Sequence, residues 1–95
     1  MSERANEVRK AFKVYGRVQG IGFRWWTRSQ AHRLGLNGSV RNCFDGTVDV
    51  VIGGPATAVH EMVKLLKVGP AGAHVERLDE LPGPDSLPDA FKILL

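Results

Sequence analysis

Two short motifs in the first half of the chain contain residue types that can bind phosphate and orient a water molecule. The first motif is the glycine-rich stretch 16–24, GRVQGIGFR. Its two inner glycines, Gly20 and Gly22, allow a tight turn in which successive N–H groups converge on one anion. A helix that begins near Phe23 adds its positive end, and the planar guanidinium of Arg24 can bind two phosphate oxygens. By composition alone, a simple tight turn beside a solvated arginine is an equally good interpretation.

The second motif is Val40-Arg41-Asn42, shortly before the turn pair Asp45-Gly46. The side-chain amide of Asn42 can donate and accept hydrogen bonds at the same time, so it can orient a water molecule toward a phosphorus atom. Taken by itself, Asn42 also fits a residue that ends a strand through turn hydrogen bonds. Arg41 is either electrostatic support for such a site or an exposed strand residue.

The elements that must position these residues follow from hydrophobic periodicity. Residues 10–16 alternate between apolar and polar, which predicts a strand. The spacing of Phe23, Thr27, Ala31 and Leu34 is that of one helical face. The remaining predicted elements are strands over 37–43 and 48–52, a helix from about Pro55 to residue 66, strands over 73–78 and 91–95, and an irregular connection over 81–89.

This order predicts an α+β fold of the ferredoxin-like βαββαβ type, with an antiparallel sheet, both helices on one face and a short terminal strand. We expect residues 1–7 to be a flexible N-terminal tail and residues 8–95 to form one domain. Trp25 and Trp26 cannot both face the sheet. One of them should therefore line the mouth of the site or be partly exposed.

The charge is unevenly distributed along the 95 residues. The net charge is +3, but residues 8–44 contain eight Lys and Arg and no Asp or Glu. Such asymmetry favours an anionic partner for the basic half. Because 43% of the residues are hydrophobic, the chain is not compositionally disordered.

Several classes of protein are excluded by the same composition. The single cysteine, Cys43, permits no internal disulfide and is too few for a cysteine zinc site. The histidines His32, His60 and His74 lack metal-ligand spacing, so we expect no metal and no cofactor. No apolar run is long enough for a membrane span, and the N-terminus lacks a signal peptide. We therefore expect a cytoplasmic protein.

The two motifs, in this order and at this distance, resemble the acylphosphatase signature. The resemblance continues more loosely through Gly69-Pro70 to Phe91-Lys92-Ile93, and spans about residues 12–95. It implies a ferredoxin-like fold and metal-independent hydrolysis of the carboxyl–phosphate bond of a small acyl phosphate. We also expect a monomer without nucleic-acid or membrane partners.

The resemblance also implies roles for particular residues. Arg24 would bind the phosphoryl group together with backbone amides of the preceding loop, and Asn42 would position the attacking water. The loop residues that supply the amides are Gln19, Gly20, Ile21, Gly22 and Phe23.

Two alternatives remain open. The first is a non-catalytic module that binds nucleic acid or another anion on the same fold. It is less favoured because the aromatic residues of an RNA-recognition motif lie on sheet strands, whereas Phe23, Trp25 and Trp26 lie on a helix. The second is a specialised acylphosphatase-like domain, such as the one at the N-terminus of a hydrogenase-maturation carbamoyltransferase.

Overall fold

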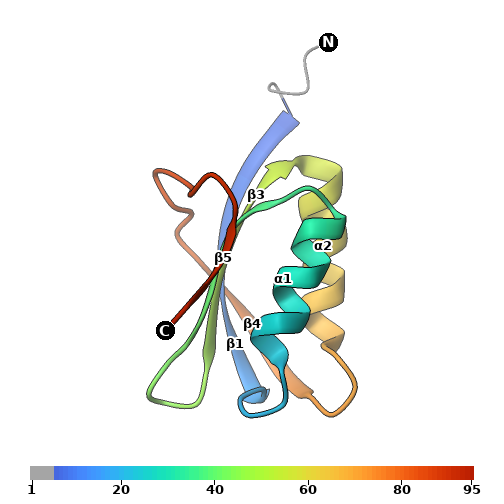
Figure 1. Ribbon diagram of the computed structural model, residues 1–95, viewed down its shortest axis with the longest axis vertical. Coiled ribbons are helices and arrows are strands. Elements are labelled where there is room, and N and C mark those ends of the chain that lie inside the picture. The colour runs from blue at the N-terminus through green and yellow to red at the C-terminus, as the bar shows by residue number, and fades with distance from the viewer. Residues whose placement is uncertain (1–5) are drawn as a thin grey trace.

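Five strands form one sheet, and two helices cover one of its faces (Figure 1). The computed structural model describes residues 6–95. Along the chain the elements are β1 (Glu7–Arg17), α1 (Phe23–Arg33), β2 (Asn37–Asn42), β3 (Val48–Pro55), α2 (Ala56–Val68), β4 (His74–Leu81) and β5 (Phe91–Leu94). The predicted order of elements and the ferredoxin-like α+β fold are confirmed.

Strand lengths differ from the sequence-based expectation where charged residues obscure the alternation. β1 begins at Glu7, which pairs with Pro55 of β3, and β4 continues to Leu81, which pairs with Ala11 of β1. Hydrogen bonds to a neighbouring strand hold these ends extended, and local sequence carries little signal for that. Glu7, predicted as the last residue of a tail, thus belongs to β1, and residues 1–5 of that tail lie outside the described residues.

The sheet is mixed, which corrects the expectation of an antiparallel sheet. Its strand order is β4-β1-β3-β2-β5, and the pairing of β2 with β5 is parallel. Residues 82–90 carry the chain from β4 at one edge to the opposite edge, where Phe91 pairs with Gly38 near the start of β2. Because β5 begins beside the beginning of β2, the two strands run in the same direction.

The hydrophobic core lies between the helices and one face of the sheet. The predicted stripe of α1 is buried at Phe23, Thr27 and Ala31, and the buried hydroxyl of Thr27 donates to the Phe23 carbonyl at 2.8 Å. Trp26 packs against Phe23, whereas Trp25 is exposed, as expected for this pair. The other buried apolar residues of this core are Phe12, Val14, Val18, Leu36, Val40, Val48, Val50, Ile52, Val59, Met62, Leu66 and Phe91.

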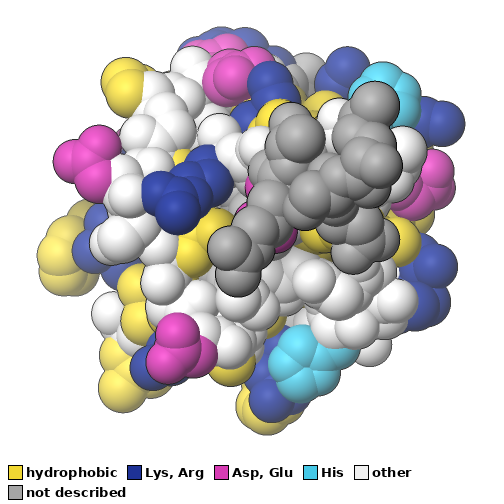
Figure 2. All heavy atoms as spheres, turned by 90° about the horizontal axis from the view of Figure 1, so that it is seen from above, with side chains coloured by type: hydrophobic (Ala, Val, Ile, Leu, Met, Phe, Trp, Pro, Cys, Tyr) yellow, Lys and Arg dark blue, Asp and Glu magenta, His cyan; other side chains and the backbone are white. Residues whose placement is uncertain are grey.

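This topology brings the two sequence motifs to one end of the molecule. The loop between β1 and α1 and the turn between β2 and β3 both lie at the lower end in Figure 1. Figure 2 views the opposite end, where acidic and basic side chains are interspersed. Within residues 6–95, neither helix is long and apolar enough to cross a membrane.

Candidate active site

A cavity of about 220 Å³ lies between the start of α1 and the end of β2. Residues of both sequence motifs contribute to its wall, although they are distant in the chain. The lining residues are Val18, Gly20, Gly22, Phe23, Arg24, Trp25 and Asn42. The cavity is therefore the place where the two motifs meet.

The loop on one side of this cavity presents backbone N–H groups. Gly20 and Gly22 have φ angles of 78° and 80°, in the left-handed region that glycine adopts most easily. Among the described residues, the N–H groups of residues 19–22 find no hydrogen-bond acceptor. Gly22 is also the N-cap of α1 and supplies no side-chain cap. N–H groups without an acceptor among the described residues and the positive end of a helix thus lie in the loop that lines this cavity, a combination that suits an anion.

Arg24 lies in the first turn of α1, and its guanidinium contacts the end of the edge strand β5. Its Nη1 donates to the carbonyl of Leu94 at the end of β5, at 3.2 Å. Within residues 6–95, Arg24 forms no ion pair with an acidic side chain. Its positive charge is consequently available to an anion in the cavity.

Asn42 lies at the end of β2, on the helix-covered face of the sheet. Side chains alternate along a strand, so Asn42 shares the face of the buried Val40, and Arg41 lies on the open face. The Oδ1 atom of Asn42 is buried and has no hydrogen-bond partner among residues 6–95. A buried acceptor without a partner lowers the stability of the fold by about 1–3 kcal/mol. The Oδ1 atom is therefore suited to accept a hydrogen bond from a molecule that binds in the cavity.

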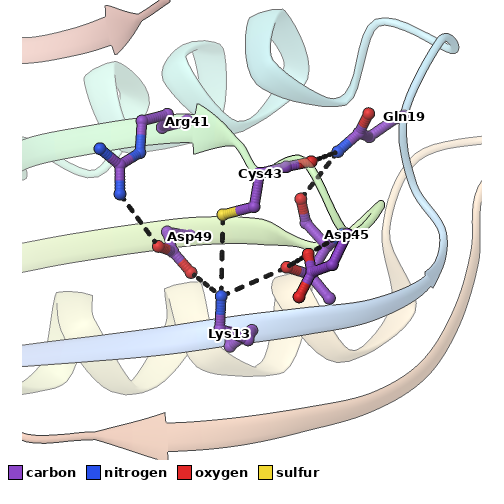
Figure 3. A network of polar contacts seen from close by, with 7 residues as sticks. Lys13, Gln19, Arg41, Cys43, Asp45 and Asp49 are labelled. Carbon is purple, nitrogen blue, oxygen red and sulfur yellow. Dashed lines mark hydrogen bonds and ion pairs between the residues drawn. The ribbon is translucent and has the colours of Figure 1, made fainter.

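Two of the predicted loop residues, Gln19 and Ile21, do not line this cavity. Ile21 packs against the hydrophobic core. The Gln19 side chain instead ties the loop to the β2–β3 turn, because its Nε2 donates to the carbonyls of Cys43 at 2.7 Å and Thr47 at 2.9 Å (Figure 3). The loop and the strand end that carries Asn42 are thus held together by a side chain that the sequence suggested only as a backbone donor.

The β2–β3 turn is the hairpin predicted from Asp45-Gly46. The Asp45 carboxylate accepts hydrogen bonds from the hydroxyl and the N–H of Thr47, and these bonds lower its pKa. The N–H of Cys43 donates to the Thr47 carbonyl at 2.9 Å and closes the turn. A rigid turn fixes the end of β2 immediately beside Asn42.

On the open face of the sheet, charged side chains from three neighbouring strands form a group that was not predicted from the sequence. Lys13 of β1 is 2.8 Å from the Asp49 carboxylate of β3, and Arg41 of β2 is 3.4 Å from it (Figure 3). Burial alone would raise the pKa of Asp49, but the hydrogen bond from Lys13 and its positive charge lower it. The same hydrogen bond raises the pKa of Lys13. Arg41 is thus exposed and paired with Asp49.

We expect Asp49→Asn to lower the free energy of unfolding by about 1 kcal/mol at pH 7, because two cations lose the carboxylate between them. The folded-state pKa of Asp49 is below its ordinary value of 3.8. The ionised carboxylate therefore stabilises the fold above that value, and the contribution is lost as the pH falls through the folded-state pKa. Urea unfolding of both proteins between pH 7 and about pH 2 measures this.

The matched control is Glu61→Gln, since Glu61 is an exposed carboxylate 3.7 Å from Lys64 on α2. We expect that control to change the free energy of unfolding by less than about 0.5 kcal/mol. The assigned charge interaction would be contradicted if the difference in free energy of unfolding between wild type and Asp49→Asn stayed constant down to the lowest pH.

Comparison with known proteins identifies the family. The family model described as Acylphosphatase matches residues 10–93. A relative from Rhizobium etli named "Acylphosphatase" is 44% identical over 98% of each chain. The chain belongs to the acylphosphatase family. Two motifs carried the resemblance to acylphosphatases in the sequence: the loop between β1 and α1, and the end of β2 at Asn42. In the fold both motifs line one cavity.

Solved acylphosphatases have the same fold. The structure of an acylphosphatase from Coxiella burnetii superposes with a TM-score of 0.85 at 30% identity and covers 96% of each chain. An acylphosphatase from Bacillus subtilis gives a TM-score of 0.83 at 31% identity, over 92% of this chain and 98% of that one. The ferredoxin-like arrangement is therefore the one that acylphosphatase structures have.

The side chains outside the two acylphosphatase motifs offer little further chemistry. His32, His60 and His74 are all exposed. In the part of the chain from residue 6 onward, no three His, Cys, Asp or Glu side chains are grouped as they would be around a metal ion. Cys43 is a free, half-buried thiol whose sulfur lies 3.7 Å from Lys13 Nζ.

Proposed function

We propose that this protein hydrolyses the carboxyl–phosphate bond of acyl phosphates, releasing a carboxylate and inorganic phosphate. Arg24 and the backbone amides of residues 19–23 bind the phosphoryl group in this proposal, and Asn42 positions the attacking water. The observation that carries it is the shared cavity. Arg24 and the loop lie on one wall, and the buried, unpartnered Oδ1 of Asn42 belongs to the facing strand end.

The electrostatics of the cavity support a phosphoryl ligand. Arg24, the cation that lines the cavity, has no acidic partner in the described chain, whereas Lys13 and Arg41 share Asp49. The cavity therefore carries one positive charge, that of Arg24, which is not paired with an acidic side chain. Attraction of a small dianion to this point weakens as ionic strength rises.

The proposed reaction needs little covalent assistance from the protein. The water oxygen attacks phosphorus, the bond from phosphorus to the acyl oxygen breaks, and the bond electrons leave with the carboxylate. One proton of the water passes to a phosphate oxygen, so the products are a carboxylate and dihydrogen phosphate. A carboxylate is a good leaving group, and positioning with charge stabilisation carries most phosphoryl transfer.

The Asn42 amide suits the water because it offers both an acceptor and donors. Its Oδ1 accepts a hydrogen bond from the water and thereby aims a lone pair of the water oxygen at phosphorus. Neither sequence motif contains a side-chain base. For this reason the proposal assigns the proton to the substrate phosphate.

The test is release of inorganic phosphate from acetyl phosphate by the purified protein in the presence of EDTA. We expect turnover that is saturable in acetyl phosphate and inhibited competitively by added inorganic phosphate, since both occupy the loop. We expect EDTA to leave the rate unchanged.

Absence of turnover above the spontaneous rate would refute the proposal and favour the anion-binding alternative. A requirement for added metal would refute the metal-independent reaction. Monomeric state and cytoplasmic location remain predictions from the sequence.

A further inference from the structure

Several exposed apolar side chains lie at or next to the candidate active site. In the described part of the chain, the large hydrophobic residues with high exposure are Trp25, Phe44, Val68, Leu94 and Leu95. Trp25 lines the phosphoryl cavity, and the carbonyl of Leu94 holds Arg24. Phe44 is fully exposed at the tip of the β2–β3 turn. Exposed aromatic side chains gathered at one site mark a binding surface more often than isolated ones do.

A second, larger cavity of about 560 Å³ adjoins the phosphoryl cavity. Its lining residues are Gln19, Arg41, Asn42, Cys43, Phe44 and Leu95. Asn42 lines both cavities, and Gln19 lies between two residues of the smaller one, Val18 and Gly20. A substrate whose phosphoryl group occupies the loop therefore has a space of ligand size directly beside it.

The positive charge beside this second cavity is only partly free for an anionic occupant, because its two cations share a carboxylate. Arg41 is its cationic side chain, and Asp49 lies 3.4 Å from the guanidinium. Lys13, the other cation on that face, is paired with the same carboxylate. The apolar side chains Phe44 and Leu95 are by contrast fully exposed, so an apolar ligand would remove their surface from water.

We infer that the larger cavity is the acyl subsite and that it selects acyl phosphates with an apolar acyl group of about aromatic size. This inference rests on the proposed hydrolysis. The phenyl ring of Phe44 contacts the acyl group from the turn side, and Leu95 contacts it from the end of β5. A methyl group, as in acetyl phosphate, is too small to reach both.

Substrate selectivity tests the subsite. The probes are acetyl phosphate, benzoyl phosphate and succinyl phosphate, whose acyl group carries a second carboxylate. We measure kcat and KM for each substrate with wild type and with Phe44→Ala, Phe44→Leu and Val68→Ala. Each variant is scored by its benzoyl-to-acetyl ratio of kcat/KM, because the intrinsic reactivity of each substrate is the same for every variant.

We expect Phe44→Ala to lower this ratio about fivefold, mainly through a higher KM for benzoyl phosphate, because ground-state and transition-state contacts with the ring are alike. Phe44→Leu should keep most of the ratio, since it keeps an apolar side chain. Val68→Ala removes an exposed apolar side chain at the end of α2, away from both cavities, and should leave the ratio unchanged. Phe44 is exposed, so its variants should unfold like wild type.

An unchanged ratio in Phe44→Ala would overturn the subsite and leave the proposed hydrolysis intact. Preference of wild type for succinyl phosphate over benzoyl phosphate would also overturn it, because Arg41 would then dominate selectivity. Turnover of none of the three substrates would overturn the proposed hydrolysis and the subsite with it.

Discussion

Arg24→Ala is expected to reduce kcat/KM for acyl phosphate hydrolysis by about a thousandfold, the range seen when one charge-stabilising group is removed from an acyl- or phosphoryl-transfer site. Arg24 is the cation of the cavity without an acidic partner, and among residues 6–95 no other guanidinium or ammonium lines it. The loss should appear in both KM and kcat, because the arginine contacts the phosphoryl oxygens before and during the reaction.

The same substitution should hardly alter stability. Within the described residues, the Arg24 side chain makes one hydrogen bond, at 3.2 Å to the carbonyl of Leu94, and it is partly exposed. We expect a change in the free energy of unfolding of less than about 1 kcal/mol. Chemical denaturation and steady-state kinetics on the same preparations separate the two effects.

The matched control is Arg28→Ala, one turn further along α1. Arg28 lies over the exposed ring of Trp25 at 5.8 Å and lines neither cavity. Its loss should change kcat/KM by less than about threefold, through the weaker long-range attraction of the anion. Arg24→Lys keeps the positive charge but not the planar guanidinium, so we expect its kcat/KM to lie between those of Arg24→Ala and wild type. Equal activities of wild type and Arg24→Ala would contradict the assigned role.

Asn42→Ala is expected to lower kcat about a hundredfold, with a smaller change in KM. In the proposal the asparagine orients the water and does not hold the phosphoryl group. Loss of Asn42 should therefore slow the reaction of bound substrate more than it weakens binding. This split between kcat and KM distinguishes Asn42 from Arg24.

The structure also predicts an unusual effect of Asn42→Ala on stability. Its Oδ1 is buried and lacks a partner among residues 6–95, so truncation removes an unpaired acceptor. We expect the free energy of unfolding to stay the same or rise by up to about 1 kcal/mol, as happens at sites where function opposes stability. Urea denaturation measures this shift.

Asn37→Ala provides the control, since Asn37 is an exposed asparagine at the opposite end of β2. It should leave kcat and KM close to those of wild type. A large loss of stability in Asn42→Ala would show that the amide mainly supports the strand end. The fall in kcat would then not report on water positioning.

Much of the fold could be predicted because its signals are local. Alternation of Val48, Val50 and Ile52 indicates a strand buried on one side, and the stripe of Phe23, Thr27 and Ala31 indicates a helix with one buried face. The sequence predicted an antiparallel sheet and did not indicate the parallel pairing of β2 with β5. That pairing depends on where residues 82–90 return the chain to the sheet, which no local pattern specifies.

The residues of the candidate site could likewise be predicted from residue types and spacing. Glycines before a helix start, an arginine in its first turn and an amide at a strand end indicate phosphate chemistry even before the fold is known. The side-chain role of Gln19 was not visible, because its acceptors at Cys43 and Thr47 belong to a turn that is distant in sequence.

By itself the sequence therefore determined the elements, their order, the family resemblance and the kinds of side chain available for chemistry. Only the tertiary structure decided that Asn42 lines the same cavity as Arg24, that its Oδ1 is buried without a partner among residues 6–95, and that Lys13 and Arg41 share the Asp49 carboxylate. The physical reason is strand register. A slip of one residue in β2 would exchange the faces of Arg41 and Asn42, and the register comes from long-range hydrogen bonds and core packing rather than from neighbouring residues.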